Sequence, residues 1–321
     1  MNYKKRVTIL ASCAGALALV YILSFVFSSE SRARRGAAWS PLDKKAALSA
    51  TRIIISGREE ETVLEKIDGV WKIRFEQELF PAKAARIDDL LDALTKSAEY
   101  PVRAASESAW EKLGVGESAE KIAVKDGDIT LASLYFGDTD ATGKSIYLRN
   151  APAAAVRSGE DIFSVYLAGT HKNYLDLTFF PNKETAGLAV DTVQRVLVTP
   201  PPPKEGEAAR ESYAINREAG DWKIDGGANG NKTEIESMIR YIIDSSGEDY
   251  ISVKKVLGAD FTRANGEVVL ETGTGGRASI TLGPKIEDKQ TAKISGSEYI
   301  FVISDWAAGR IWRSKQELSE K

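Results

Sequence analysis

The sequence predicts an α+β protein: an N-terminal transmembrane helix followed by two tandem repeats, each a hairpin, a helix and an antiparallel meander. Three observations lead to this fold class: a long uncharged run near the start, segments that recur in both halves, and amphipathic patterns of helical and strand period between them. The chain has 321 residues, of which 43% are hydrophobic and 28% charged. That length allows about two globular units, and that composition is typical of a folded protein.

The first element is an apolar run long enough to cross a bilayer. Residues 1–6 form a basic tail with Lys4, Lys5 and Arg6, and the uncharged run of residues 7–27 follows. A helix needs about 20 apolar residues to span a hydrocarbon core, whereas the apolar region of a cleaved signal peptide has only about 7–15. The sequence therefore predicts a retained transmembrane anchor over residues 7–27.

The single cysteine, Cys13, lies inside this run. Residues 10–13, with the sequence Leu-Ala-Ser-Cys, resemble a bacterial lipoprotein processing box, in which cleavage precedes a lipidated cysteine. The apolar stretch before Cys13 is short and the residues after it stay apolar, which favours an unmodified cysteine within the membrane. Lipidation of Cys13 remains the alternative, and both versions place the protein on a membrane.

A polar, aperiodic stretch, residues 28–48, follows the run and is predicted to be a juxtamembrane linker. It contains Arg32, Arg34 and Arg35, which equal in number the basic residues before the run. The positive-inside rule compares the Lys and Arg near the two ends of a span, so this tie leaves the orientation open.

The remaining chain carries the same succession of patterns twice. Residues 52–56 recur as residues 195–199, and each is followed, after a turn region, by a second strand that ends in Trp-Lys-Ile, at residues 71–73 and 222–224. An amphipathic helix comes next in both copies, and one apolar stripe on a helix is what packing onto a sheet requires. The apolar residues of the two helices share the spacing i, i+3, i+4, i+7: Ile87, Leu90, Leu91 and Leu94, then Ile235, Met238, Ile239 and Ile242.

Strand-like segments complete each copy. In the first copy they are residues 121–124, 129–136, 145–148 and 162–165, and in the second 267–270, 278–282 and 298–302. The pair Asp126-Gly127, between alternating apolar segments, is a strong hairpin signal. The first repeat is therefore placed at residues 49–172 and the second at 192–321, joined by the apolar connecting segment 173–191. Whether the two sheets are separate or merged stays open.

Two loops of the second repeat invite a functional interpretation. Residues 271–276, with the sequence Glu-Thr-Gly-Thr-Gly-Gly, resemble a phosphate-binding loop, but such loops precede a helix, and residues 277–282 alternate like a strand. We therefore predict a hairpin turn. The four prolines from Pro200 to Pro203 favour polyproline II, and we predict a stiff, exposed hairpin insert, with docking to a partner as the alternative.

The remaining candidate residues have structural explanations. Trp71 and Trp222 occupy matching strand positions and are predicted to be core residues. The helix residues Asp88, Asp89, Asp92, Glu234 and Glu236 lie off the apolar stripes and are predicted to face solvent. The single histidine, His171, follows the last strand of the first repeat in a polar turn and is predicted to lie on the surface, without a nucleophile partner.

Composition excludes several functions. There are 43 basic and 46 acidic residues, a net charge of −3, which gives no general attraction to nucleic acid. One cysteine and one histidine cannot form an intrachain disulfide or a Cys/His zinc site. The sequence thus predicts no catalytic, cofactor-binding or metal-binding residue, and it identifies no binding residue.

Several segments together resemble the bacterial family DUF4340. They are the Trp71-Lys72-Ile73 strand, the helix around residues 87–94, Trp110-Glu111-Lys112-Leu113-Gly114, Phe136-Gly137, Ile146-Tyr147-Leu148-Arg149, and the passage from Tyr174-Leu175-Asp176-Leu177 to Val193-Gln194-Arg195-Val196-Leu197. The resemblance implies a single-pass protein of the bacterial inner membrane whose bulk is periplasmic, often encoded with ABC-transporter components of the gliding-motility auxiliary type. It implies no established activity.

We therefore expect a non-enzymatic, membrane-anchored envelope protein that binds or scaffolds a protein partner, such as an auxiliary component of an ABC-type transport or gliding-type complex. Two alternatives remain. One is an envelope glycan-modifying hydrolase that uses carboxylates, and the other is a lipid- or glycan-binding module with its site between the repeats.

Overall fold

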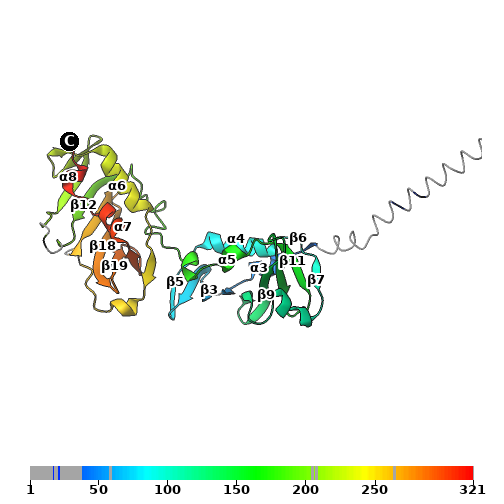
Figure 1. The fold of residues 1–321 in the computed structure, drawn as a ribbon. Coiled ribbons are helices and arrows are strands. Elements are labelled where there is room, and N and C mark those ends of the chain that lie inside the picture. The colour runs from blue at the N-terminus through cyan, green and yellow to red at the C-terminus, as the bar shows by residue number, and fades with distance from the viewer. Residues whose placement is uncertain are drawn as a thin grey trace, which may run out of the picture. The chain divides into compact units, whose positions relative to one another are not determined.

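Hairpin follows hairpin along this chain, so its sheets are antiparallel. The computed structural model describes residues 17, 21, 38–57, 60–203, 206, 209–262 and 265–320. It is mostly β-sheet with several short helices, which confirms the α+β class (Figure 1). The chain divides into two compact units: unit 1 comprises Met1–Phe75 and Ala82–Tyr174, and unit 2 comprises Glu76–Pro81 and Leu175–Lys321.

Each of the two large sheets has nine strands, and the sheets are separate. In spatial order the first contains β5 (Glu78–Pro81), β4 (Val70–Phe75), β3 (Glu61–Ile67), β2 (Arg52–Ser56), β8 (Glu120–Asp126), β9 (Ile129–Thr139), β10 (Ser145–Asn150), β11 (Val156–Glu160) and β7 (Val102–Ala104). The second contains β15 (Ala228–Asn229), β14 (Asp221–Ile224), β13 (Tyr213–Glu218), β12 (Val193–Thr199), β17 (Glu267–Thr272), β18 (Arg277–Ile286), β19 (Lys289–Ile294), β20 (Ile300–Ile303) and β16 (Asp249–Ile251). The two orders correspond strand for strand when the strands are matched along the chain.

The two main helices also occur at corresponding places. Among the helices of the described residues, α4 (Ala84–Thr95) and α6 (Lys232–Asp244) are the longest, and they follow the fourth strand of each sheet. The residues of their predicted apolar stripes are buried except the half-buried Leu91. The shorter α-helices are α3 (Lys44–Leu48), α5 (Ser164–Leu167), α7 (Asp305–Ile311) and α8 (Lys315–Leu318). The 3-10 helices are η1 (Glu107–Ala109), η2 (Glu111–Leu113), η3 (His171–Tyr174) and η4 (Val253–Val256). A two-stranded sheet joins β1 (Ala38–Trp39) to β6 (Ala98–Glu99).

The two Trp-Lys-Ile tryptophans have similar surroundings. Trp71 and Trp222 are buried, and each pairs across its hairpin with a basic residue, Lys66 and Arg217 respectively, whose charged group lies over the indole ring. The carbonyl oxygen of each tryptophan accepts a hydrogen bond from the chain just before the following helix. Both are core residues, as predicted.

One predicted strand is wrong. Residues 162–165 do not continue the first sheet, because β11 ends at Glu160 and α5 begins at Ser164. The carboxylate of Asp161 accepts hydrogen bonds from the backbone NH groups of Phe163 and Ser164 and from the Ser164 hydroxyl. Such local side-chain bonds compete with a strand ladder and turn the chain.

The segments before the first strand of each sheet are structured. Within the stretch predicted to be a linker, residues 28–48, lie β1 and α3, and Leu42 is buried with its NH bonded to the carbonyl of Leu94. In unit 2, Phe179 is buried in the same way, and its NH bonds to the carbonyl of Ser245 after α6. We call residues 38–50 and 176–188 the lead-in segments of unit 1 and unit 2.

Almost all of the predicted anchor, residues 7–27, lies outside the described residues, as do Cys13 and the arginines at 32, 34 and 35. Within the described residues, no helix has both the length and the apolar character needed to cross a bilayer.

Candidate functional site

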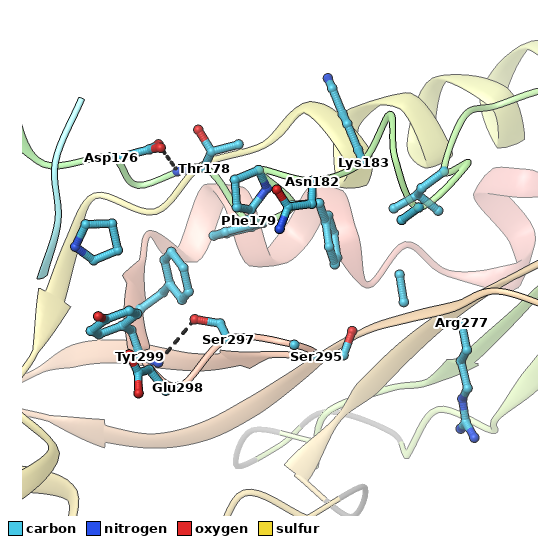
Figure 2. A pocket seen from close by; sticks show the side chains of 18 of the residues that line it. Asp176, Thr178, Phe179, Asn182, Lys183, Arg277, Ser295, Ser297, Glu298 and Tyr299 are labelled. Carbon is cyan, nitrogen blue, oxygen red and sulfur yellow. Dashed lines mark hydrogen bonds between the residues drawn. The ribbon is translucent and has the colours of Figure 1, made fainter. Parts of the chain in front are cut away.

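A pocket of about 710 Å³ lies within unit 2, and we call it the unit-2 pocket. The lead-in segment forms one wall, while the β17–β18 turn and the β19–β20 connection form the other (Figure 2). Its lining residues are Pro81, Asp176, Thr178, Phe179, Phe180, Pro181, Asn182, Lys183, Ala186, Leu188, Tyr250, Thr272, Gly276, Arg277, Ala278, Ser295, Gly296, Ser297, Glu298, Tyr299 and Phe301.

The lead-in segment is held in place by backbone bonds to the residues that follow α6. Thr178 and Ser246 form an antiparallel bridge, and the NH of Gly247 donates to the carbonyl of Leu177 at 2.8 Å. The buried Phe179 belongs to the core beneath α6. This wall is therefore part of the folded unit and not a free loop over the pocket.

Aromatic rings in mutual contact form one end of the pocket. Phe301 lies between Phe179, at 5.3 Å between ring centroids, and Tyr250, at 4.8 Å, and Tyr250 is 5.3 Å from Tyr299. The Tyr250 hydroxyl donates to the carbonyl oxygen of Asp176. Burial raises the pKa of Tyr250 well above its usual value, so this hydroxyl stays protonated and keeps donating at any physiological pH.

Several polar groups that line the pocket form hydrogen bonds within the segments that make up its walls. The Thr272 hydroxyl accepts from the NH of Gly276 at 2.9 Å and thereby closes the β17–β18 turn. On the other connection, the Ser297 hydroxyl accepts from the NH of Tyr299 at 3.1 Å, and one carboxylate oxygen of Asp176 accepts from the NH of Thr178 at 3.1 Å (Figure 2). What remains is a largely apolar, aromatic interior whose lining also includes Asp176, Lys183, Arg277 and Glu298, and it suits a ligand with an apolar side.

In unit 1, a hydrogen bond spans the space that corresponds to the unit-2 pocket. The amide of Asn150, at the end of β10, donates to the carbonyl of Pro41 in the unit-1 lead-in segment at 2.9 Å. Strand register makes Ile294 of β19 the counterpart of Asn150, because Asn150 pairs with Leu134 and Ile294 pairs with Ile280 in matching strands. An isoleucine cannot make this bond, so unit 2 lacks the link that ties the strand to the lead-in segment in unit 1.

The Gly-rich loop at residues 271–276 is the hairpin turn that was predicted. It joins β17 to β18, and no helix follows it. Thr272 and Gly276 of this turn line the unit-2 pocket, so the loop contributes to a site, though not as a phosphate loop. The prolines from Pro200 to Pro203 lie between β12 and β13, in the predicted hairpin loop, where Pro202 and Pro203 are exposed.

The prediction for His171 is wrong, because this residue is buried. Its ring stacks on Phe75 at 3.9 Å between centroids, and Nδ1 lies 2.8 Å from a carboxylate oxygen of Glu60. The same carboxylate also accepts from the His171 backbone NH. The polar sequence around His171 gave no sign of this contact, because its two partners lie about a hundred residues earlier in the chain.

The helix carboxylates divide into two groups. Asp88, Asp89 and Asp92 are exposed on α4, as predicted. Glu234 and Glu236 of α6 are half-buried, since they pair with Arg313 at 2.7 Å and with Arg217 at 3.1 Å. Within the described residues, no cluster of three or more His, Cys, Asp or Glu could hold a metal ion.

Sequence reasoning missed the unit-2 pocket because it treated residues 173–191 only as a connection. The available signal was the aromatic pair Phe179-Phe180 followed by Pro181, in a segment too apolar for a free linker. The other wall comes from two turns that are far apart in the sequence, and their proximity depends on the sheet order.

Comparison with known proteins gives one positive result. No curated protein and no solved structure matches the chain. The family described as "Domain of unknown function (DUF4340)" matches residues 71–260, from β4 of the first sheet to the residues after η4. This match covers more than half of the chain and agrees with the resemblance of the segments around Trp110, Gly137 and Arg149. The chain belongs to the DUF4340 family.

Proposed function

We propose that this protein is a non-enzymatic, membrane-anchored protein of the bacterial envelope that holds a protein partner through unit 2. The observation that carries the proposal is the unit-2 pocket, which would receive an extended apolar segment of that partner. Its volume of about 710 Å³ lies within the roughly 300–1,000 Å³ range of ligand sites, and its interior is mainly aromatic and aliphatic.

The fixed walls of the pocket favour binding. Tyr250 is locked by its bond to Asp176, and the Thr272 and Ser297 hydroxyls are engaged in turns. A pre-formed site loses little conformational entropy when a ligand enters, so more of the contact energy remains as affinity. A partner segment with one or two large apolar side chains would cover the aromatic end.

The four carboxyls with a shifted pKa among the described residues do not support the hydrolase alternative. A carboxyl that acts as general acid needs a raised pKa. In Glu65, Asp140, Asp225 and Glu317 the pKa is instead lowered, because each carboxylate accepts hydrogen bonds from a neighbouring side chain: Arg74, Thr142, Lys315 and Ser314 respectively. Glu65 and Asp225 form ion pairs, Glu317 belongs to the capping box of α8, and Asp140 closes the turn between β9 and β10.

The membrane location rests on the sequence. The uncharged run of residues 7–27 has the length of a bilayer-spanning helix. The resemblance to DUF4340 proteins supports a periplasmic position for the bulk of the chain and an ABC-type transport or gliding-type complex as the source of the partner. The common strand order of the two sheets supports an origin of the chain by internal duplication.

The test is to fill the pocket and follow capture of the partner in intact membranes. A photo-crosslinking phenylalanine analogue at the exposed pocket residue Asn182 should form adducts with a protein. Adding Ala186→Trp, at another exposed lining residue, should reduce adduct yield at least about tenfold, equivalent to ~1.4 kcal/mol of binding free energy.

The matched control is Ala189→Trp, because Ala189 is exposed in the same stretch of chain but does not line the unit-2 pocket. This variant should leave the adducts unchanged. Equal adduct yields in the two tryptophan variants would refute the proposal. Adducts with lipid or glycan alone would favour the second candidate, a small-ligand-binding module, which the pocket volume also suits.

A further inference from the structure

A second concave surface of unit 2 lies along helices α6 and α7, and we call it the α6–α7 groove. It consists of two neighbouring hollows of about 540 and 250 Å³, which share Ser237, Tyr241 and Arg310 as lining residues. The larger hollow is completed by Arg240, Asp244, Ser245, Ser246, Gly247, Glu248, Ser304, Trp306 and Ala307, and the smaller by Glu234, Met238, Gly309, Arg313 and Glu317.

The groove contains an exposed aromatic side chain that is not part of the hydrophobic core. Trp306, in the first turn of α7, is 66% exposed, although tryptophan is usually buried to a large extent. Its ring meets Tyr241 edge to face at 5.8 Å between centroids. The Arg310 guanidinium lies 4.9 Å from the Tyr241 ring centroid and 5.2 Å from that of Trp306.

These contacts restrict the guanidinium of Arg310. The rings of Tyr241 and Trp306 are nearly perpendicular, at 88°, and the guanidinium lies near both. Cation–π attraction to the two rings restricts its position, and its NH groups can form a two-pronged bond to a carboxylate. The side chain loses part of its rotational freedom before any partner arrives. Arg310 is therefore positioned to bind an anionic group beside an apolar surface, which is the ring of Trp306.

The charges around the groove leave two arginines available. Glu234 pairs with Arg313, and Asp244 pairs with Lys183, so these carboxylates are already compensated. In the described part of the chain, no ion pair is formed by Arg240 or Arg310, both of which are exposed. The larger hollow thus offers two uncompensated guanidinium groups and one further carboxylate, that of Glu248.

We propose that the α6–α7 groove binds an acidic segment of a protein, with a carboxylate on Arg310 and an adjacent apolar side chain on Trp306. The inference rests on the proposed function, that unit 2 holds a protein partner, and gives the chemistry of that partner at a second contact. Trp, Tyr and Arg are the residue types that dominate the binding energy of protein interfaces. A flat anionic bilayer fits a concave groove poorly.

The experiment uses the full chain in detergent micelles and fluorescence anisotropy of a labelled peptide of alternating Glu and Leu. Binding is expected to weaken as salt rises, and a Lys–Leu peptide of equal length should not bind. Arg310→Gln and Trp306→Ala should each weaken binding at least tenfold. Arg195→Gln removes the same charge from an exposed site in unit 2 outside the groove, and it should change binding by less than twofold.

Failure of the Glu–Leu peptide to bind, or equal binding by Arg310→Gln, would overturn the inference. Preference for polygalacturonate or for phosphatidylglycerol vesicles over the peptide would overturn it in favour of a glycan or a membrane surface. Crosslinking from Asn182 separates the two proposals. If Arg310→Gln and Trp306→Ala bind the peptide as the wild type does while Ala186→Trp still abolishes adducts, the groove inference fails and the proposed function stands.

Discussion

Replacing Gly137 by alanine is expected to destabilise unit 1 by about 2–3 kcal/mol, because the added methyl group has no space. Gly137 lies in β9, and a Cβ there would come within 2.1 Å of the carbonyl oxygen of Leu113 and 2.9 Å of the backbone carbon of Gly114. Both obstacles are backbone atoms at the end of η2. Relief therefore requires the turn as a whole to move away from the strand.

Urea denaturation of the full chain, followed by tryptophan fluorescence, measures this change, since Trp39, Trp71 and Trp110 report on unit 1. The matched control is Gly116→Ala. A Cβ at Gly116 also meets an atom at 2.1 Å, but that atom is the carboxylate end of the flexible, exposed Glu111 side chain. The control should lower the free energy of unfolding by less than about 1 kcal/mol. An equal decrease in the two variants would show that backbone crowding does not cause the destabilisation by Gly137→Ala.

Local periodicity predicted the regular part of this fold well. The i, i+3, i+4, i+7 stripe at Ile87 and the matching one at Ile235 became the buried faces of α4 and α6. The Asp126-Gly127 pair became the turn between β8 and β9. In each case the information lies within about ten residues, because burial on one face of a helix or sheet sets the spacing.

Prediction failed where a local side-chain bond overrides the strand pattern, and where contacts between distant residues decide the outcome. Residues 162–165 have a strand-like composition, yet the Asp161 side chain turns the chain into α5. His171 looked exposed in its polar turn, but Phe75 and Glu60 cover it. The unit-2 pocket could not be predicted for the same reason. The lead-in segment and the turn at Gly276 lie close together because of the sheet order, which the sequence does not show.

Four of the residues that carry the family resemblance meet at one place in unit 1. Trp110 and Gly114 flank η2, Gly137 lies against the end of η2, and Arg149 of β10 inserts beside Trp110. This cluster packs with the buried Val115 into a small core of its own. The resemblance is thus carried at this place by residues that hold the chain between β7 and β8 onto the sheet, and the cluster offers no evident ligand site.

Replacing Arg149 by alanine is expected to produce the largest loss, about 3–5 kcal/mol in unit 1, comparable to truncation of a large core side chain. Arg149 is 2% exposed, and its guanidinium lies between two rings, 3.8 Å from the Trp110 centroid and 4.0 Å from that of Tyr135. Its Nε donates to the carbonyl of Val115 at 3.2 Å. Alanine removes both stacking contacts and this bond, and it leaves a cavity.

Native-state hydrogen exchange localises this loss, because protection of amides in β9 and β10 should fall about tenfold for each ~1.4 kcal/mol. The matched control is Arg74→Ala in the same unit. Arg74 forms an exposed cross-strand ion pair with Glu65 at 2.5 Å, and exposed pairs contribute about 0–1 kcal/mol. Arg149→Lys keeps the charge but loses the planar stacking, so it should recover only part of the stability. Full recovery by lysine would mean that charge, and not the ring sandwich, is what unit 1 requires at this position.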